Sequence, residues 1–337
     1  DSLNATKAAI EEGVVSGGGQ TFFSFYGIVK QELDRSSFEL IGTPKLIFKG
    51  TEIGLTEGPH IYKKDSLYYL LTAEGGTEYN HAVTLARSES IDGPYEVHPH
   101  NPVLTSKGDT TLALQKAGHA SLVQTQGDQW YMPHLCGRPL PGTKRCNLGR
   151  ETAIQKMEWR DDGWLYVAGG GNNPKETVDA PDLPFHPWPE LEPRVPFTSP
   201  HFATPRGPAS TIEPTDTILR LYGSESLESC FPKSLLARRL TSHNLTATTH
   251  LSFSPTSFQQ MAGLTAYYNN RLFYHLYLSH DEVAGYCLHI HSCDDGASSF
   301  PLGTKPLPLE CTDIFLRAIF EGSSLQFSWS LTGETFS

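Results

Sequence analysis

A carboxylate stands directly before a Gly-Pro bend in the segment Thr56-Glu57-Gly58-Pro59-His60. Gly58 lets the backbone pass close to a ligand, and Pro59 fixes its own φ, so the carboxyl group of Glu57 is held on a rigid corner. A side chain that donates a proton needs such fixed placement before it needs an adjusted pKa. The segment therefore fits a general acid, and a glutamate that merely ends a strand is the alternative for so short a motif.

The strands around this corner fall into two groups that superimpose. One group opens at Glu57 and the other at Gly118-His119-Ala120, and the later strands of the two are predicted at 68–73, 82–88 and 95–97, and at 129–135, 150–159 and 164–167. A repeated unit of about four strands is typical of β-propeller blades. The first strand of each blade lines the propeller axis, so we expect Glu57 and His119 to converge on one pocket.

The composition agrees with an all-β protein and excludes some classes of partner. The 337 residues include 30 glycines and 24 prolines, and only 19% are charged, which suits many short strands joined by turns. The net charge of −11 argues against nucleic acid or an anionic membrane as partner but leaves a neutral ligand such as a sugar open. No apolar run reaches the roughly 18 residues that would span a membrane.

The six cysteines show no Cys-x-x-Cys pair and no zinc-type spacing with histidine. Cys136 and Cys146 flank a loop short enough to be closed by a disulfide, and free buried thiols are an equal alternative. The sequons Asn4-Ala5-Thr6 and Asn244-Leu245-Thr246 matter only in a secreted protein. The compartment therefore stays open.

A proline-rich stretch from Asn173 to Pro193 predicts an inter-domain linker. Beyond it the spacing of the apolar runs predicts an antiparallel β-sandwich, with strands at 219–223, 234–239, 247–253, 262–268, 272–278, 314–320 and 325–330. We therefore predict two domains, residues 1–190 and 191–337.

With these motifs in order, the chain resembles family 43 glycoside hydrolases, specifically the two-domain β-xylosidases in which a β-sandwich follows a five-bladed propeller. The resemblance covers essentially everything after about Phe22. It rests on TEGPH (56–60), TAEGGT (72–77), GHASL (118–122), GRPLP (137–141), LGRETAIQK (148–156), LRLYG (219–223), ARR (237–239) and SFQQMAGLT (257–265). The implied fold is all-β, with late blade 3 to blade 5 of the propeller followed by the antiparallel, concanavalin-like sandwich.

The resemblance also implies roles for individual residues. Glu57 matches the general acid that protonates the leaving glycosidic oxygen. Arg150 matches an arginine that hydrogen-bonds the terminal sugar, and a salt bridge to Glu151 is the alternative. His119 matches the histidine on the propeller axis beneath the sugar, and Thr77 lies in a loop that can reach the substrate.

Glu74, in the same loop as Thr77, is interpreted as support for the loop. The resemblance requires no cofactor. Some relatives hold an axial calcium ion, but we do not expect one here, because calcium prefers several oxygen ligands and the chain offers no carboxylate cluster.

Two aspartates of the family have no matching position in this chain. One is the general base, and the other orients and tunes the acid. Asp65, Asp92, Asp128 and Asp161 all stand in turn sequences, where aspartate is favoured by turn geometry. We therefore expect a fragment or one half of a nicked protein, which lacks an N-terminal segment with the base and the last strands of the sandwich.

The expected function is an exo-acting β-1,4-xylosidase that removes xylose from the non-reducing ends of xylo-oligosaccharides with inversion, together with α-L-arabinofuranosidase activity. This chain alone is expected to be inactive. The competing hypothesis is a non-catalytic carbohydrate-binding protein. The expected partners are the xylo-oligosaccharide and the missing N-terminal segment, and a homo-oligomer is compatible with the sequence; nucleic acid and membranes are not expected.

Overall fold

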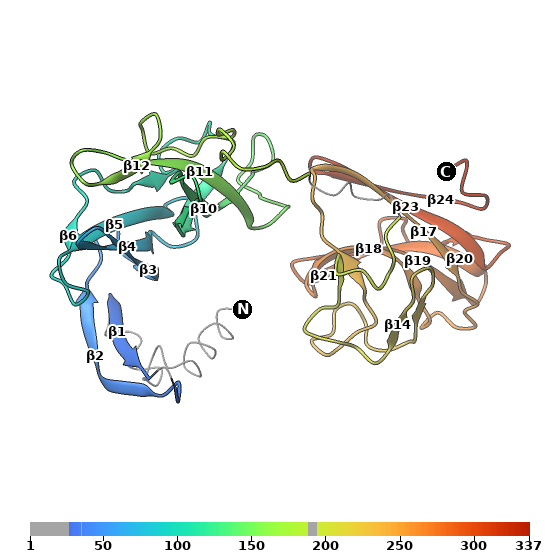
Figure 1. The fold of residues 1–337 in the computed structure, drawn as a ribbon. Coiled ribbons are helices and arrows are strands. Elements are labelled where there is room, and N and C mark those ends of the chain that lie inside the picture. Colours follow the sequence, from blue (N-terminus) through green and yellow to red (C-terminus); the bar gives the residue numbers. More distant parts are fainter. Residues whose placement is uncertain (1–26, 35, 188–193) are drawn as a thin grey trace. The chain divides into compact units, whose positions relative to one another are not determined.

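The computed structural model of the chain describes residues 27–34, 36–187 and 194–337. This part consists of strands and turns and contains no helix, and therefore none long and apolar enough to cross a bilayer. It divides into two compact units between His186 and Pro187 (Figure 1). The predicted all-β class is confirmed.

The first unit contains two similar antiparallel sheets, each with one strand added at its edge. The first sheet runs β3 (Glu57–Lys64), β4 (Leu67–Glu74), β5 (Ala82–Ser88) and β6 (Glu96–Val97), with β7 (Leu104–Thr105) paired to β5. The second runs β8 (Gln115–Ala120), β10 (Trp130–Gly137), β11 (Glu151–Trp159) and β12 (Leu165–Val167), with β9 (Val123–Gln124) paired to β10. A hairpin of β1 (Ile28–Leu33) and β2 (Leu40–Phe48) precedes them. Each four-stranded sheet is one propeller blade.

The first strand of the second blade begins earlier than predicted. The second group of strands was expected to open at Gly118-His119-Ala120, whereas β8 already begins at Gln115 and ends at Ala120, and only the short β9 follows. Lys116 and His119 adopt positive φ angles of 57° and 47°, and the pairing of β8 with β10 shifts register twice. These irregularities interrupt the alternation on which the prediction depended.

One apolar core joins the two blades and so fixes the strands that carry the site. Its buried members come from both sheets, namely Tyr69, Leu71, Val83, Leu85, Val103, Leu104, Ala117, Ala120, Met132, Met157, Trp164, Leu165 and Val167. The ring of Tyr69 packs edge-on against Trp159 at 4.7 Å, and its hydroxyl donates to the Gly163 carbonyl at 2.6 Å. This contact ties β4 to the turn between β11 and β12.

The segment that leads into Glu57 is anchored by the fully buried carboxylate of Glu74. That carboxylate accepts hydrogen bonds from the backbone N–H of Thr51 at 2.9 Å, from the Thr51 hydroxyl, and from the Thr56 hydroxyl at 3.1 Å. A buried carboxylate needs such donors to offset its lost hydration. The sequence placed Glu74 in the loop that contains Thr77 and as its support, whereas Glu74 is the last residue of β4 and its carboxylate holds the separate segment from Thr51 to Thr56.

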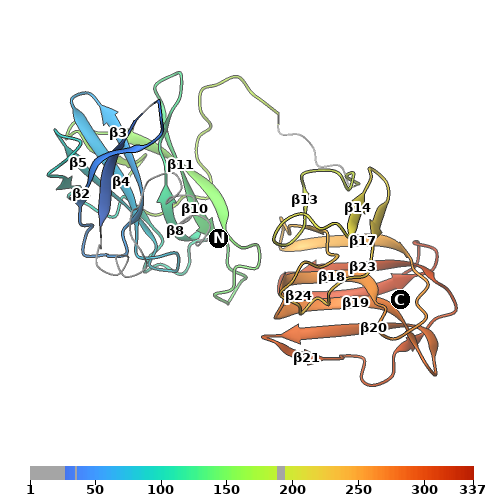
Figure 2. The same ribbon diagram turned by 90° about the horizontal axis from the view of Figure 1, so that it is seen from below.

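The second unit is an antiparallel sandwich whose long strands are seen side by side in Figure 2. One sheet runs β17 (Asn244–Ser252), β23 (Asp313–Glu321) and β24 (Ser324–Ser330). The other runs β18 (Ala262–Asn269), β19 (Leu272–Asp281), β20 (Gly285–Asp294) and β21 (Ala297–Ser299), with β22 (Leu307–Pro308) paired to β20. Their inner faces meet in a core that contains Leu276, Leu278, Leu288, Ile314 and Leu316.

The sequence prediction missed β20 and overextended one short strand. In β20 the apolar positions alternate with cysteines and histidines, so the run lacks a plain apolar pattern. The strand expected at 234–239 is reduced to β16 (Ala237–Arg238), which pairs with β13 (Phe202–Ala203). A further small pair joins β14 (Ile212–Pro214) to β15 (Leu219–Leu221).

All six cysteines lie within the described residues, and all six are free thiols. The disulfide between Cys136 and Cys146, one of the two alternatives raised by the sequence, is not formed in this structure. Burial raises the pKa of the Cys136 thiol to about 11. This thiol is therefore a poor nucleophile, since the thiolate is the reactive form.

A buried histidine, His98, stands between aromatic rings of the first unit. Its ring packs edge-on against Trp164 at 4.7 Å and Tyr166 at 4.8 Å, and its Nδ1 accepts the backbone N–H of His100 at 3.0 Å. Burial, with a smaller contribution from His100, lowers the pKa of His98 to about 4. The native state therefore holds this ring neutral.

The free energy of unfolding of the first unit should consequently fall on acidification. A histidine whose pKa is lower in the folded than in the unfolded state contributes fully above pH 6.5, and the contribution is lost as the pH falls through about 4. The loss attributable to His98 should reach about 2–3 kcal/mol. Hydrogen exchange of β4 and β5 amides at pH 7 and pH 4.5 measures it. His98→Gln should reduce the difference, whereas the exposed control His100→Gln should not; an equal response of both variants would contradict the assignment.

Candidate active site

Glu57 is the first residue of β3 and pairs with Ala73 of β4. The register shifts between Glu57 and His60, where Gly58 takes the left-handed φ of +55°. This bulge turns the start of β3 away from regular pairing and leaves the Glu57 side chain exposed. The carboxyl group is thus presented at a strand end rather than packed within the sheet.

Three polar side chains from separate parts of the two blades converge at this point. One carboxylate oxygen of Glu57, one ring nitrogen of His81 and one ring nitrogen of His119 lie within 4.8 Å of one another. Glu57 comes from β3, His119 from β8, and His81 immediately precedes β5. The structure therefore brings Glu57 and His119 together, as the blade pattern predicted, and adds His81, which the sequence analysis did not single out.

Two glycines make this convergence sterically feasible. A Cβ added to Gly58 would lie 2.7 Å from Nε2 of His119, and a Cβ added to Gly118 would lie 2.4 Å from carbons of the His81 ring. Contacts below 3.0 Å are essentially never tolerated between such atoms. Each imidazole therefore lies against a backbone segment that has no side chain.

His81 is almost completely buried, at 2% exposure. Its Nδ1 lies 3.0 Å from the carbonyl oxygen of Lys116, while its Nε2 is buried and has no hydrogen-bond partner among the described residues. Burial is the main cause that lowers the pKa of His81, and His119 and Arg150 act in the same direction, whereas the Lys116 carbonyl and Glu57 act against it. The ring is accordingly neutral near pH 7.

Two further histidines near the cluster, His60 and His134, also have lowered pKa values. Burial, followed by the proximity of His119, lowers the pKa of His60. Behind His81, burial lowers the pKa of His134, whose Nε2 lies 3.3 Å from the amide nitrogen of Gln155. Neutral imidazoles therefore surround the cluster.

Arg150 directly precedes β11, and its charge acts on His81, which places its guanidinium in the neighbourhood of the cluster. The salt bridge to Glu151 was the alternative for this residue. Glu151 is instead held by Arg138, whose Nη2 donates to Oε1 at 2.7 Å and whose Nε contacts both carboxylate oxygens at 3.1 Å. Among the described residues Arg150 forms no ion pair.

Thr77 lies in an exposed bend after β4. Within the described part of the chain no hydrogen bond links it to Glu57, His81 or His119. Thr77 therefore lies on the bend that follows Glu74, the last residue of β4, and its contact with the substrate stays a prediction.

The cluster fits calcium poorly. Calcium takes six to eight oxygen ligands, whereas two of these three donors are imidazole nitrogens and only one is a carboxylate. We therefore propose no role for calcium in the chemistry of this site.

The family was established by comparison with known proteins. The model of "Glycosyl hydrolases family 43" matches residues 14–165, and that of the "Beta xylosidase C-terminal Concanavalin A-like domain" matches residues 195–337. The chain belongs to glycosyl hydrolase family 43. Its first unit is accordingly part of the family's propeller, and its second unit is the concanavalin-like sandwich.

Individual relatives agree with this family. The chain is 44% identical to the beta-xylosidase of Bacillus subtilis over 92% of its own length and 61% of the relative's. It is also 44% identical to a xylan 1,3-beta-xylosidase of a Vibrio species, over 94% of the chain and 62% of the relative. The crystal structure of a xylan beta-1,4-xylosidase from Bacillus halodurans superimposes with a TM-score of 0.87 at 47% identity, covering 92% of this chain and 61% of that one. The chain thus spans about three fifths of the length of these relatives.

The sequence carried a weak signal for His81. His81 stands directly before a strand of a blade, but it is preceded by the polar run Glu78-Tyr79-Asn80, which resembles an ordinary turn. Only the fold shows that the start of β5 meets β8. Gly118, whose missing side chain makes room for the His81 ring, stands in the motif GHASL, which by itself gives no sign of this contact.

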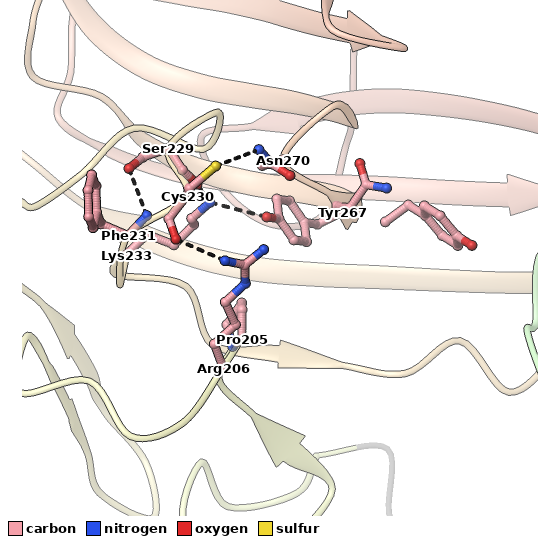
Figure 3. A pocket seen from close by; sticks show the side chains of 10 residues that line it. Pro205, Arg206, Ser229, Cys230, Phe231, Lys233, Tyr267 and Asn270 are labelled. Carbon is pink, nitrogen blue, oxygen red and sulfur yellow. Dashed lines mark hydrogen bonds between the residues drawn. The ribbon is translucent and has the colours of Figure 1, made fainter. Parts of the chain in front are cut away.

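The sandwich unit contains a separate pocket of about 150 Å³, shown in Figure 3. Its charged groups are engaged by the chain itself, since Lys233 donates to the carbonyls of Leu227 and Ser229 and lies 3.2 Å from the Tyr267 hydroxyl. Arg206 likewise donates to the Cys230 carbonyl at 3.0 Å. These bonds stabilise the loop against β18 and give the pocket a structural role.

Substituting Gly58 should test the packing at the cluster. Gly58→Ala should lower the free energy of unfolding by about 1–2 kcal/mol through its left-handed φ, and its new methyl group should also displace His119. Gly54→Ala is the matched control, because Gly54 has a φ of +75° and an added Cβ would meet nothing within 4 Å. Chemical denaturation and the ring NMR signals of His119 distinguish the two. If both variants left these signals unchanged, the proposed contact would be wrong.

Proposed function

We propose that this chain contributes the general acid and much of the sugar-binding wall of an inverting, exo-acting β-xylosidase. The observation that carries the proposal is the convergence of Glu57 with His119, near Arg150, at the inner strands of two family 43 blades. Xylosidases among the relatives support xylo-oligosaccharides as the substrate class.

In this proposal Glu57 donates its proton to the glycosidic oxygen as the bond to the anomeric carbon breaks. Its exposed position at the end of β3 gives it access to a substrate. An inverting enzyme needs a second carboxyl group about 6.5–9.5 Å away, with a water molecule between it and the sugar. The cluster contains no second carboxylate among the described residues, so we propose that the base is an aspartate outside this chain.

Arg150 and His119 are proposed to hold the terminal sugar. A guanidinium presents several N–H groups in a fixed fork, which suits adjacent hydroxyl groups, and no described carboxylate pairs with Arg150. His119, at a φ of +47°, is held in a backbone conformation that costs about 1–3 kcal/mol for a residue with a side chain. Such strain is often found at ligand sites. Thr77 is proposed to contact the substrate from the exposed bend that follows β4.

The linkage is proposed to be β-1,4, with removal of terminal α-L-arabinofuranosyl groups as a companion activity. The relatives include xylosidases named for 1,3 and for 1,4 linkages, so the linkage depends on details of the pocket beyond the shared family. Xylose and arabinofuranose present similar hydroxyl arrangements to such a wall. The missing second carboxylate is the observation that favours the alternative, a carbohydrate-binding protein without turnover.

The isolated chain should bind xylose but hydrolyse aryl xylosides poorly. Loss of the base removes the activation of water, a contribution of about 10²–10⁴-fold. Calorimetric xylose binding and aryl-xyloside turnover by the 337-residue chain measure the two properties. Robust turnover would show that a base lies within the chain and overturn this part of the proposal.

Glu57→Gln tests the acid in an active background. The background is a chimaera that joins the chain to the propeller segment of the Bacillus subtilis relative expected to carry the two aspartates. Glu57→Gln should lower xylobiose hydrolysis by about 10²–10⁴-fold, because a poor leaving group needs the proton. Glu158→Gln, a carboxylate paired with Arg160 at 2.8 Å, is the control and should have little effect. Full activity of Glu57→Gln would refute the acid.

A further inference from the structure

His81 offers a buried hydrogen-bond acceptor to the cluster. A carbonyl oxygen only accepts hydrogen bonds, so the 3.0 Å contact with the Lys116 carbonyl places the proton of the neutral ring on Nδ1. Nε2 must then carry a lone pair. Lys116 itself adopts a φ of 57°, and its ammonium group is held by Glu78, so the carbonyl contact is part of a well-connected corner.

Few donors can reach this lone pair. Nε2 of His81 is buried and has no partner among the described residues. A ring nitrogen of His81 lies within 4.8 Å of a ring nitrogen of His119 and of a Glu57 oxygen. Glu57 becomes a donor only when it is protonated, which is the form that a general acid needs.

Two further neighbours of His81, namely His134 and Arg150, do not serve as this donor. His134 contacts the Leu135 carbonyl through Nδ1 and Gln155 through Nε2. Arg150 acts on His81 through its charge and lowers the pKa of that ring, but its guanidinium makes no hydrogen bond to Nε2 of His81. A neutral acceptor such as this ring favours the protonated form of a neighbouring carboxyl group.

We propose that His81 is a positioning residue for the proton-donating step, which holds the protonated carboxyl group of Glu57 by accepting its O–H at Nε2, directly or through one water molecule. A hydrogen bond to the neutral form of a carboxyl group favours that form. After the proton has moved to the glycosidic oxygen, the Nε2 lone pair faces a carboxylate, a repulsive contact that favours reprotonation. The inference rests on the proposed role of Glu57 as the acid.

The tautomer of His81 can be measured without turnover. The measurement is ¹⁵N NMR of the 337-residue chain labelled with ¹⁵N-histidine. The signals of His81 are identified by their loss in His81→Gln. They should show the Nδ1–H tautomer and a neutral ring at pH 6–7. An Nε2–H tautomer or an imidazolium at this pH would overturn the proposal, because Nε2 would then be a donor. This result is independent of whether the chain hydrolyses xylosides.

Leaving-group dependence tests the effect on catalysis in the chimaera. His81→Leu removes the acceptor, whereas His81→Gln retains an acceptor oxygen near the position of Nε2. His81→Leu should lower kcat/KM for xylobiose about tenfold or more, which is less than the roughly 10²–10⁴-fold contribution of a general acid. It should also move the basic limb of the profile of kcat/KM against pH to lower pH. Hydrolysis of 2,4-dinitrophenyl xyloside, whose leaving group needs no proton, should change less than about threefold.

His81→Gln should recover most of the xylobiose activity, and the exposed control His100→Leu should leave both substrates unaffected. Equal losses on the two substrates, or no recovery in His81→Gln, would show a merely structural role and overturn the proposal. If Glu57→Gln is fully active, the proposed function fails. If Glu57→Gln is impaired as expected but His81→Leu affects xylobiose and the activated xyloside equally, only the inference about His81 is rejected.

Discussion

The site depends on close steric contact between imidazole rings and backbone that lacks side chains. Gly58 on β3 lies against His119, and Gly118 on β8 lies against His81. Each glycine thus admits a ring carried by another strand or loop, so the two contacts interlock β3, β5 and β8. A methyl group at either glycine would push these segments apart, and the three polar groups would no longer share one small space.

Burial then determines the charge state of this space. His60, His81 and His134 all have a pKa lowered mainly by the loss of hydration, so imidazoles accumulate beside the cluster without accumulating positive charge. This matters for a carboxyl group that must carry a proton, because nearby cations favour its ionised form. Arg150 is the cation acting on the cluster, and its suitability for sugar hydroxyls gives a reason for its presence.

The supporting structure is divided between apolar packing and buried hydrogen bonds. The core around Tyr69 and Trp164 holds the blades together, while the Glu74 carboxylate holds the loop that enters Glu57 from behind. In the sandwich unit, Lys233 has a comparable role for a loop against β18. In both cases a buried polar side chain orders irregular backbone, because apolar side chains cannot form hydrogen bonds with its N–H and carbonyl groups.

The sequence by itself determined the all-β class, the repeated blades, the family and the placement of Glu57 and His119 at related positions, because alternation, turn residues and motif order are local properties. The sequence did not predict β20 or the correct start of β8, because neither strand has a regular apolar alternation. Only the tertiary structure decided that His81 joins Glu57 and His119 and that Arg138 rather than Arg150 pairs with Glu151. These outcomes depend on which strands meet and on the space left by two glycines, which are distances between residues far apart in the chain.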